Sequence, residues 1–167
     1  MIILLKPLEQ HQENISKNHR VQFNKVEMVQ YTTEDQSDAA FEELVGKAER
    51  LVQELGLHYR LSKLAAGDCS FSMARTYDIE VWIPSMGIYK EVSSASNARD
   101  YQARRGNVKY RGADKKLHLA HTLNASGLAT SRVIPAIVEQ YQNDDGSVTV
   151  PEVLRPYLGI DRIEKQR

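Results

Sequence analysis

Hydrophobic and polar positions alternate along several short segments of the chain, and this period of two predicts β-strands. Segment 21–31 is rich in Val, Phe and Tyr, which favour strands. Segment 77–84 sets Ile79, Val81 and Ile83 against polar neighbours, and the turn PSMG then joins it to a hairpin partner. Further strands are predicted at 58–64, 87–94 and 116–124.

A different spacing marks the clearest helix. Apolar side chains recur every three or four residues from 41 to 55, over about four turns, which predicts a helix with one apolar stripe against a sheet. Ser37 or Asp38 is predicted to cap its start. Gly56 is predicted to take the left-handed conformation that ends a helix.

A second helix is predicted at 128–142. This segment is rich in Val, Ile and Ala and has few charges, so we expect it to be mostly buried, with a kink at Pro135. Strands outnumber helices, and neighbouring strands are joined by hairpins. The pattern therefore predicts an α+β fold in which two helices back an antiparallel sheet.

Composition sets broad limits. The 167 residues suit one domain, and the 22 Lys and Arg balance the 22 Asp and Glu, so net charge indicates no partner. The single cysteine, Cys69, excludes an internal disulfide and fits a reducing compartment. The apolar start at 2–5 is too short for a signal peptide or a membrane span, so we expect a cytoplasmic protein with no membrane partner. Residues 6–20 are polar, lack a sustained period, and are expected to form a loose arm.

The charge is unevenly distributed. Between residues 99 and 116 there are seven Lys and Arg side chains against only Asp100 and Asp114. Such a stretch is typical either of a solvated face or of a surface that contacts phosphates.

Two strand carboxylates are candidates for chemistry. Glu91 lies late in a predicted strand with apolar neighbours, where a carboxylate is costly unless it is paired or binds a cation. Together with the Ser94 hydroxyl and phosphate oxygens it would suit Mg²⁺; a strand end that emerges into solvent is the alternative. Glu27 is a similar strand carboxylate, paired either with Lys25 or with the ammonium of a ligand.

The segment SGLATSR (126–132) joins a strand end to a helix start. Ser126 and Gly127 would leave backbone N–H groups free at the positive end of the helix, where an anion is favoured. Arg132 could reach the same region with a bidentate guanidinium. Ordinary helix capping is the alternative.

Six segments, in order along the chain, carry a resemblance to a known family. They are QFNKVE (22–27), AAGDCSF (65–71), TYDIEVWIP (76–84), EVSSASNARDYQARR (91–105), HTLNASGLATSR (121–132) and DGSVTVPEVLRPYL (145–158). Over about 140 residues the chain resembles the catalytic domain of bacterial-type seryl-tRNA synthetase, a class II aminoacyl-tRNA synthetase. The resemblance implies an antiparallel class II sheet flanked by helices, truncated at the N-terminus, with residues 1–19 as an unmatched lead-in to a partial domain at 20–167.

The resemblance also implies a reaction. The family activates serine to seryl-adenylate with ATP and Mg²⁺ and transfers it to tRNA(Ser). On matching positions, Phe23 would stack on the adenine, and Glu27 would bind the serine ammonium. Asn124 and Ser126 would contact the serine substrate.

The remaining implied roles concern the nucleotide. Glu91 and Ser94 would hold Mg²⁺ and ATP, and Val92 and Ser93 would line the nucleotide. Arg132 would neutralise the phosphates, so that Arg132 and Glu91 are the implied catalytic residues.

Several parts of the family pattern have no match in the sequence. They are the helical hairpin that grips tRNA, the motif 1 dimer interface, the serine-binding loop and the first strand of motif 2. Three interpretations therefore stay open: a ligase catalytic domain in truncated form, an inactive paralogue that binds ATP, serine or tRNA, or a protein that associates with a full-length synthetase. The oligomeric state is open as well.

Overall fold

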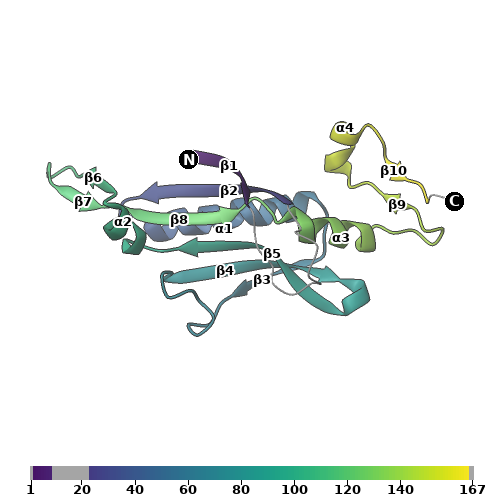
Figure 1. Cartoon of the computed structure of the whole chain (residues 1–167), viewed down its shortest axis with the longest axis horizontal. Helices are drawn as coiled ribbons and strands as arrows, with labels where there is room; N and C mark the ends of the chain where they lie inside the picture. The colour runs from purple at the N-terminus through teal and green to yellow at the C-terminus, as the bar shows by residue number, and fades with distance from the viewer. Residues whose placement is uncertain (1, 9–22, 166–167) are drawn as a thin grey trace.

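Six antiparallel strands form the central sheet of the protein in this computed structural model, which describes the backbone of residues 2–8 and residues 23–165 in full (Figure 1). In spatial order the strands are β1 (Ile2–Leu8), β2 (Phe23–Thr32), β8 (His121–Ser126), β5 (Ile88–Asn97), β4 (Arg75–Ile83) and β3 (Tyr59–Lys63). Neighbours pair antiparallel throughout, which confirms the predicted α+β sheet.

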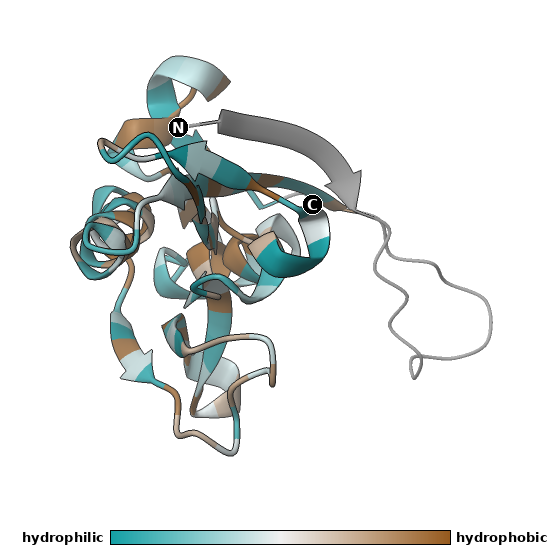
Figure 2. Cartoon of the chain, turned by 90° about the vertical axis from the view of Figure 1, so that its left-hand side faces the viewer, coloured by the Kyte–Doolittle hydropathy of each residue, from teal (hydrophilic) through white to brown (hydrophobic). Residues whose placement is uncertain are grey.

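Two helices bury the apolar side of this sheet. α1 (Ser37–Glu54) packs mainly on β5 and β8, and α3 (Thr130–Gln140) packs on β4 and β5. Figure 2 shows apolar and polar segments interleaved along these elements, as one-sided burial requires. The core residues drawn from the strands and helices include Met28, Phe41, Leu44, Ala48, Val52, Ile79, Val81, Val92, Ala95, Leu123, Ala125, Val133 and Ala136.

Short elements extend from both ends of the sheet. One end carries α2 (Tyr101–Gly106) and a hairpin of β6 (Lys109–Arg111) and β7 (Leu117–Leu119). The other end carries the turns and strands of the C-terminal segment (Figure 1). These are η2 (Glu152–Leu154), α4 (Arg155–Leu158) and the pair β9 (Val148–Thr149) and β10 (Arg162–Ile163), while η1 (Pro84–Met86) joins β4 to β5.

The first predicted helix is confirmed, and so is its end. Gly56 follows α1 with φ of 66°, in the left-handed region. The predicted cap was wrong, because the N-cap is Gln36 and no side chain caps the helix. Ser37 is instead buried at 3% exposure, where its Oγ accepts a hydrogen bond of 2.9 Å from Asn97 Nδ2.

The segment predicted as one strand at 116–124 is two strands. β7 pairs only with β6, while β8 belongs to the central sheet, and Ala120 separates them. The second helix, α3, is also more exposed than predicted: Ile134 is 59% and Val138 39% exposed. Because α3 lies at the edge of the core, it buries a narrower stripe of apolar side chains than its composition indicates.

The expected loose arm at 6–20 was wrong for its first residues. Positions 6–8 belong to β1, which pairs with β2 in the register Lys6↔Lys25 and Leu8↔Phe23. Residues 9–20 lie outside the described residues.

Candidate functional site

The sheet face opposite α1 and α3 gathers most of the polar residues singled out from the sequence. Side chains alternate along a strand, so Phe23, Lys25 and Glu27 share one face of β2 while Met28 enters the core. Glu27 stands opposite Ser126 of β8. On the next strand, Ser96 stands opposite Asn124. The site is therefore built across the adjacent strands β2, β8, β5 and β4.

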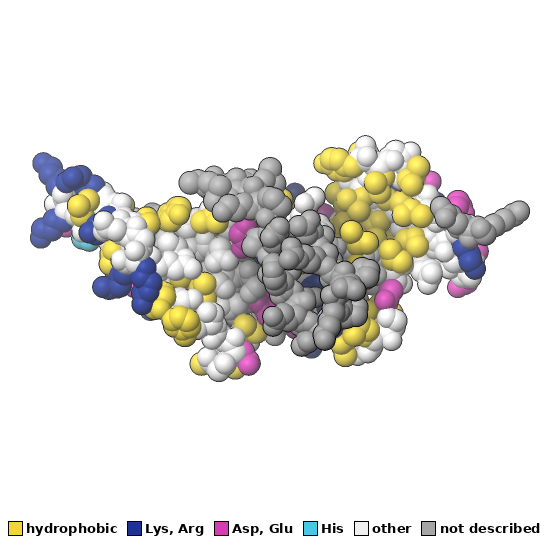
Figure 3. Space-filling view, in the orientation of Figure 1, with side chains coloured by type: hydrophobic (Ala, Val, Ile, Leu, Met, Phe, Trp, Pro, Cys, Tyr) yellow, Lys and Arg dark blue, Asp and Glu magenta, His cyan; other side chains and the backbone are white. Residues whose placement is uncertain are grey.

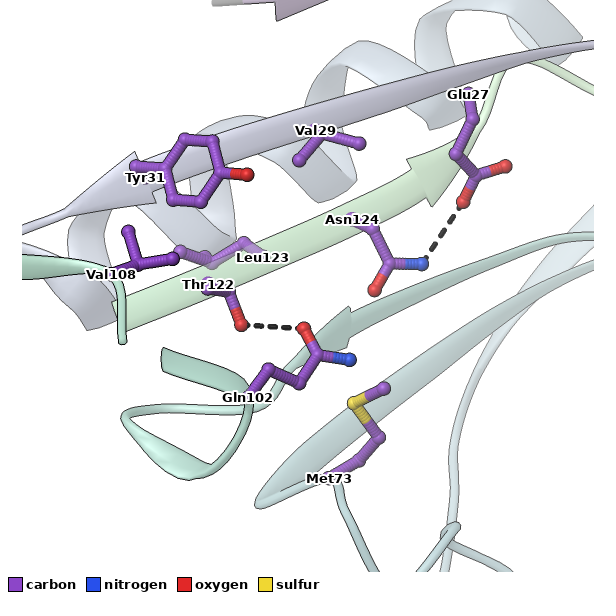
Figure 4. Close-up of a pocket in the computed structure, with 9 residues that line it drawn as sticks. All are labelled: Glu27, Val29, Tyr31, Met73, Gln102, Val108, Thr122, Leu123 and Asn124. Carbon is purple, nitrogen blue, oxygen red and sulfur yellow. Dashed lines mark hydrogen bonds between the residues drawn. The ribbon is translucent and has the colours of Figure 1, made fainter. Parts of the chain in front are cut away.

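Glu27 is the centre of a hydrogen-bonded cluster on this face. Its Oε1 accepts a hydrogen bond of 3.0 Å from Asn124 Nδ2 (Figure 4). Its Oε2 accepts one of 3.1 Å from Ser126 Oγ. Lys25 Nζ lies 3.0 Å from Glu27 Oε2 and donates to Ser126 Oγ at 2.9 Å. Pairing with Lys25, one of the two predicted alternatives, is confirmed. A carboxylate has about four acceptor positions, so Glu27 keeps capacity for a further donor.

A β-bulge brings Glu91 and Ser94 to the same face. Glu91 stands opposite Glu80, and Ser94 stands opposite Asp78. Glu91 and Ser94 are three positions apart on β5, whereas their partners Asp78 and Glu80 are only two positions apart on β4. Val92 is the extra residue, and the register shift occurs between Ile79 and Glu80 on the partner strand. Without the bulge, strict alternation would direct Glu91 and Ser94 to opposite faces.

The same bulge buries the side chains of two residues that the resemblance implies as nucleotide contacts. Val92 is fully buried in the core, and Ser93 is 1% exposed with its Oγ donating to Ser126 O at 2.8 Å. Neither side chain is accessible, so a contact with the nucleotide would involve their main-chain atoms, and the implied role stays a prediction. Their contribution is to tie β5 to the end of β8.

Two further carboxylates, which the sequence analysis did not single out, join this region from β4. Glu80 pairs with Arg60 at 2.5 Å. Asp78 has a buried Oδ1 without a hydrogen-bond partner. Burial raises the pKa of Asp78, the hydrogen bond from Ser94 lowers it, and the charges of Glu91 and Glu80 raise it further against the weaker effect of Arg132. In the sequence, Asp78 and Glu80 are the polar positions of an alternating strand, which is typical of a side that faces solvent. Only the pairing of β4 with β5 shows that they lie beside Glu91 and Ser94.

Arg132 reaches the same group from the start of α3. Its Nη1 donates to the Glu91 main-chain oxygen at 2.9 Å and lies 3.5 Å from Glu91 Oε2. At 39% exposure the side chain remains accessible to a ligand. The guanidinium therefore borders the carboxylates Glu91 and Asp78, and its contact with phosphates stays a prediction.

The junction between β8 and α3 differs from its prediction. Gly127 N–H donates to Val26 O at 2.6 Å, so it is not free for an anion, and that part of the prediction was wrong. A Cβ on Gly127 would lie 3.2 Å from Val26 Cβ and from Val26 O, which explains the glycine by close packing on β2. Ala129 N–H donates to Val92 O at 2.8 Å and fixes the start of α3 on the bulge.

A pocket of about 500 Å³ opens beside Glu27 and Asn124 (Figure 4). Its wall extends along β2 and β8 to α2, where Thr122 Oγ1 and Gln102 Oε1 are hydrogen-bonded at 2.6 Å. The remaining lining residues are Val29, Tyr31, Met73, Val108 and Leu123. This volume is within the range of small-ligand sites.

The comparisons with known proteins agree with this geometry. The model of the tRNA synthetase class II core domain (G, H, P, S and T) matches residues 12–141. The chain belongs to this class II family. It is 71% identical over 143 residues to serine–tRNA ligase 2 of Clostridium acetobutylicum, covering 85% of this chain and 34% of that protein. A serine–tRNA ligase of Thermosipho melanesiensis is 56% identical, with 85% and 33% covered. The chain thus spans about a third of the length of these relatives.

Solved structures show the same likeness. The crystal structure of seryl-tRNA synthetase from Pyrococcus horikoshii complexed with ATP superposes with a TM-score of 0.85 at 40% identity, covering 92% of this chain and 36% of that one. The cytoplasmic serine–tRNA ligase of Naegleria fowleri in complex with AMP gives 0.80 at 37% identity, with 89% and 36% covered. The resemblance to seryl-tRNA synthetases is confirmed. Within the described residues, no helix is long and apolar enough to cross a membrane.

Proposed function

We propose that this chain carries the amino-acid and nucleotide sites of a serine–tRNA ligase, which activates serine with ATP and transfers it to tRNA(Ser). The observation that carries the proposal is the adjacency of two charged groups on one sheet face. Glu27 is held by Asn124 and Ser126, while Glu91 lies beside Arg132 on the other side of β8. One group suits an ammonium and the other suits phosphates.

The Glu27 group would bind serine. A free amino acid presents an ammonium with three donors, and Glu27 can accept one of them besides its present bonds. Asn124 and Ser126 are within reach of the same ligand because both already contact that carboxylate. Lys25 balances the charge of Glu27, the one acid of this group, so the serine ammonium would join an ion pair that is already in place.

The Glu91 group would hold the phosphates of ATP with Mg²⁺. Oxygen ligands are what this ion prefers, and it commonly keeps several waters and uses few protein ligands. Glu91, Ser94 and the unpartnered Asp78 Oδ1 fit that donor set. Within the described part of the chain, no group of three His, Cys, Asp or Glu could hold a metal ion by itself. The ion would supply positive charge next to the phosphates.

Phe23 would complete the nucleotide site by stacking on the adenine. It begins β2 on the same face as Glu27 and is only partly buried. An aromatic ring contributes roughly 1–3 kcal/mol when a base stacks on it.

The chemical step needs no covalent enzyme intermediate. A serine carboxylate oxygen attacks the α-phosphorus, a new P–O bond forms, and the bond from that phosphorus to the bridging oxygen breaks so that pyrophosphate leaves. Arg132 would neutralise charge on the phosphate oxygens, and the Glu27 group would orient the nucleophile. Positioning and charge neutralisation are the main sources of rate in such in-line transfers.

Calorimetry of the full chain with two variants tests the proposal. Glu27→Gln should abolish serine binding and leave ATP binding with Mg²⁺ nearly unchanged. Arg132→Ala should weaken ATP by roughly 10- to 150-fold, since a charge-assisted hydrogen bond contributes about 1.5–3 kcal/mol, and leave serine unchanged. ATP–pyrophosphate exchange that requires serine should be lost in both.

Two outcomes would contradict this division of the face. If Glu27→Gln weakened both ligands equally, Glu27 would act on the structure of the whole face. If the chain bound ATP but serine failed to bind with or without it, the interpretation as an inactive nucleotide-binding paralogue would replace the ligase.

A further inference from the structure

Lys25 is the cation of the Glu27 group, and its contacts use only part of its donor capacity. Its Nζ lies 3.0 Å from Glu27 Oε2 and donates to Ser126 Oγ at 2.9 Å. Ser126 Oγ in turn donates to Glu27 Oε2 at 3.1 Å, so the three atoms form a closed triangle. A lysine ammonium carries three N–H donors, and the triangle uses two of them. The third has no partner among the described residues, and the side chain, at 16% exposure, can be reached by a ligand.

The place of Lys25 along β2 is as informative as its contacts. Phe23, Lys25 and Glu27 lie on the same face at intervals of two residues, or about 7 Å. The proposed function puts the adenine at the first of them and the serine ammonium at the third. In seryl-adenylate, the phosphate and the acyl carbon lie between these two groups. With the ligand in that order, Lys25 would stand beside the part in which the new bond forms.

The other cations have different positions. Arg132 donates to the Glu91 main-chain oxygen, on the other side of β8. Figure 3 shows the dark blue Lys and Arg side chains gathered mainly at the end of the molecule that holds α2 and the β6–β7 hairpin. Among the ion pairs of the described residues, Glu27 is paired only with Lys25. Lys25 is therefore the cation in position to meet a carboxylate that is held at the Glu27 group.

We infer that Lys25 binds the carboxylate of serine and orients it for the attack on ATP. Free serine is a zwitterion, whose ammonium and carboxylate are attached to the same carbon atom. The Glu27–Lys25 pair offers the two opposite charges side by side, at 3.0 Å, so one strand can bind both charged groups of the amino acid. This role rests on the proposed function, because it concerns the same serine site.

In the chemical step Lys25 would act through its charge and transfer no proton. The attacking carboxylate and the α-phosphate are both anionic, so they repel each other as they approach. The new P–O bond forms while the bond to the bridging oxygen breaks, and pyrophosphate leaves with that electron pair. An ammonium beside the forming bond offsets the repulsion. Because Glu27 and Ser126 already hold Nζ in place, this charge needs little reorganisation when the ligand binds.

A role of Lys25 confined to the structure of the site makes a different prediction. If Lys25 only balanced Glu27 and held Ser126, its loss would affect alike every ligand that has the ammonium and hydroxyl of serine. Serinamide is such a ligand, because it differs from serine only in that a neutral amide replaces the carboxylate. A comparison of serine with serinamide therefore isolates the contact between Lys25 and the carboxylate.

Calorimetric titration of the full chain with serine and with serinamide, without ATP and at about pH 6 so that both amines are protonated, tests the inference. The wild type should bind serine about 10- to 150-fold more tightly than serinamide, as expected for one charge-assisted hydrogen bond. Lys25→Met, which keeps the aliphatic part of the side chain, should remove this preference by weakening serine and not serinamide. Arg132→Ala is the control and should keep the full preference, because that guanidinium lies at Glu91.

The possible failures are distinguishable. If wild type and Lys25→Met showed the same ratio of the two affinities, the inference would be overturned and the serine site would stand. A wild type that binds serinamide as tightly as serine would overturn it without any variant, so the test does not depend on the folding of Lys25→Met. Loss of the preference in Arg132→Ala alone would assign the carboxylate to that arginine. A wild type that binds neither ligand would refute the proposed serine site, and this inference with it.

Discussion

Replacement of Asp78 by Asn should make the ligand-free protein more stable at neutral pH. The carboxylate is partly buried, its Oδ1 has no hydrogen-bond partner, and Glu91 and Glu80 repel its charge. Together these raise the pKa of Asp78 despite the bond from Ser94. The folded protein therefore holds this proton more tightly than the unfolded chain does.

The sign of the pH dependence follows from that difference. Because the folded pKa is raised, the charged form of Asp78 opposes folding above it, and stability falls as the pH rises from the unfolded value of about 3.9 through the folded one. At pH 7 the whole penalty is present in the wild type and absent in Asp78→Asn. Below about pH 4 both proteins carry a neutral side chain at this position, and their stabilities should converge.

The size of the effect can be bounded from the contacts. An unsatisfied buried polar atom costs about 1–3 kcal/mol, and since Asp78 is only partly buried and Ser94 and Arg132 offset some of the cost, we expect about 1 kcal/mol. For a chain of this size that corresponds to roughly 2–4 °C in Tm. The Asn variant should lose stabilisation by Mg²⁺ in return: for a Kd of about 1 mM, 10 mM Mg²⁺ would stabilise the wild type by about 1.4 kcal/mol.

Calorimetric melting at pH 4 and pH 7, with and without Mg²⁺, measures both effects. Glu80→Gln is the matched control, because Glu80 lies on the same strand and face but has Arg60 as a partner. Its removal relieves one repulsion on Asp78 but breaks that ion pair, so it should stabilise the protein less than Asp78→Asn does. An Asp78→Asn variant that is less stable than wild type at both pH values would refute the reasoning. It would show that the bond to Ser94 outweighs the repulsion.

Two further predictions concern the scaffold. Gly56→Ala should lower the free energy of unfolding in urea by about 2–3 kcal/mol, because φ is 66° and the new Cβ would lie 2.3 Å from Tyr141 Oη. Gly46→Ala in α1 is the control: its new Cβ would have nothing within 4 Å, so it should raise the free energy of unfolding by up to about 1 kcal/mol. A Gly56→Ala variant as stable as Gly46→Ala would show that Tyr141 moves freely. Asn97→Ala should cost about 2 kcal/mol, because the buried Ser37 Oγ and Arg99 N–H would each lose a bond, at 2.9 Å and 2.8 Å respectively. Denaturation midpoints that match the wild type would mean that water replaces both bonds.

Local patterns were sufficient for most of the fold. The strand at 77–84 and the helix at 41–55 followed from periods of two and about 3.6, and the left-handed Gly56 followed from its place after the last apolar residue. Each of these depends on residues that are neighbours in the sequence. The pattern was not sufficient where the partner of a side chain is distant in the sequence. Ser37 was predicted as a helix cap, but its hydroxyl accepts a hydrogen bond from Asn97, 60 positions away.

The candidate site divides in the same way. Glu27 and Lys25 are two positions apart on one strand, so their pairing was predictable from the sequence. Asp78 was not, because its importance arises from the pairing of β4 with β5, and no glycine or turn signal marks the bulge at Val92. The prediction that Gly127 offers a free N–H failed for a related reason, since the neighbour that accepts its hydrogen bond, Val26, lies on a strand a hundred residues earlier.

The bulge also determines the electrostatics of the proposed nucleotide side. By directing Glu91 to the face already occupied by Asp78 and Glu80, it assembles three carboxylates against the two guanidinium groups of Arg60 and Arg132. The Glu27 side has no such excess, because Lys25 balances its single acid. A polyanionic triphosphate would be repelled by the first group unless a cation accompanied it. The geometry therefore favours a nucleotide that binds together with its divalent ion, on a face whose proposed serine side requires none.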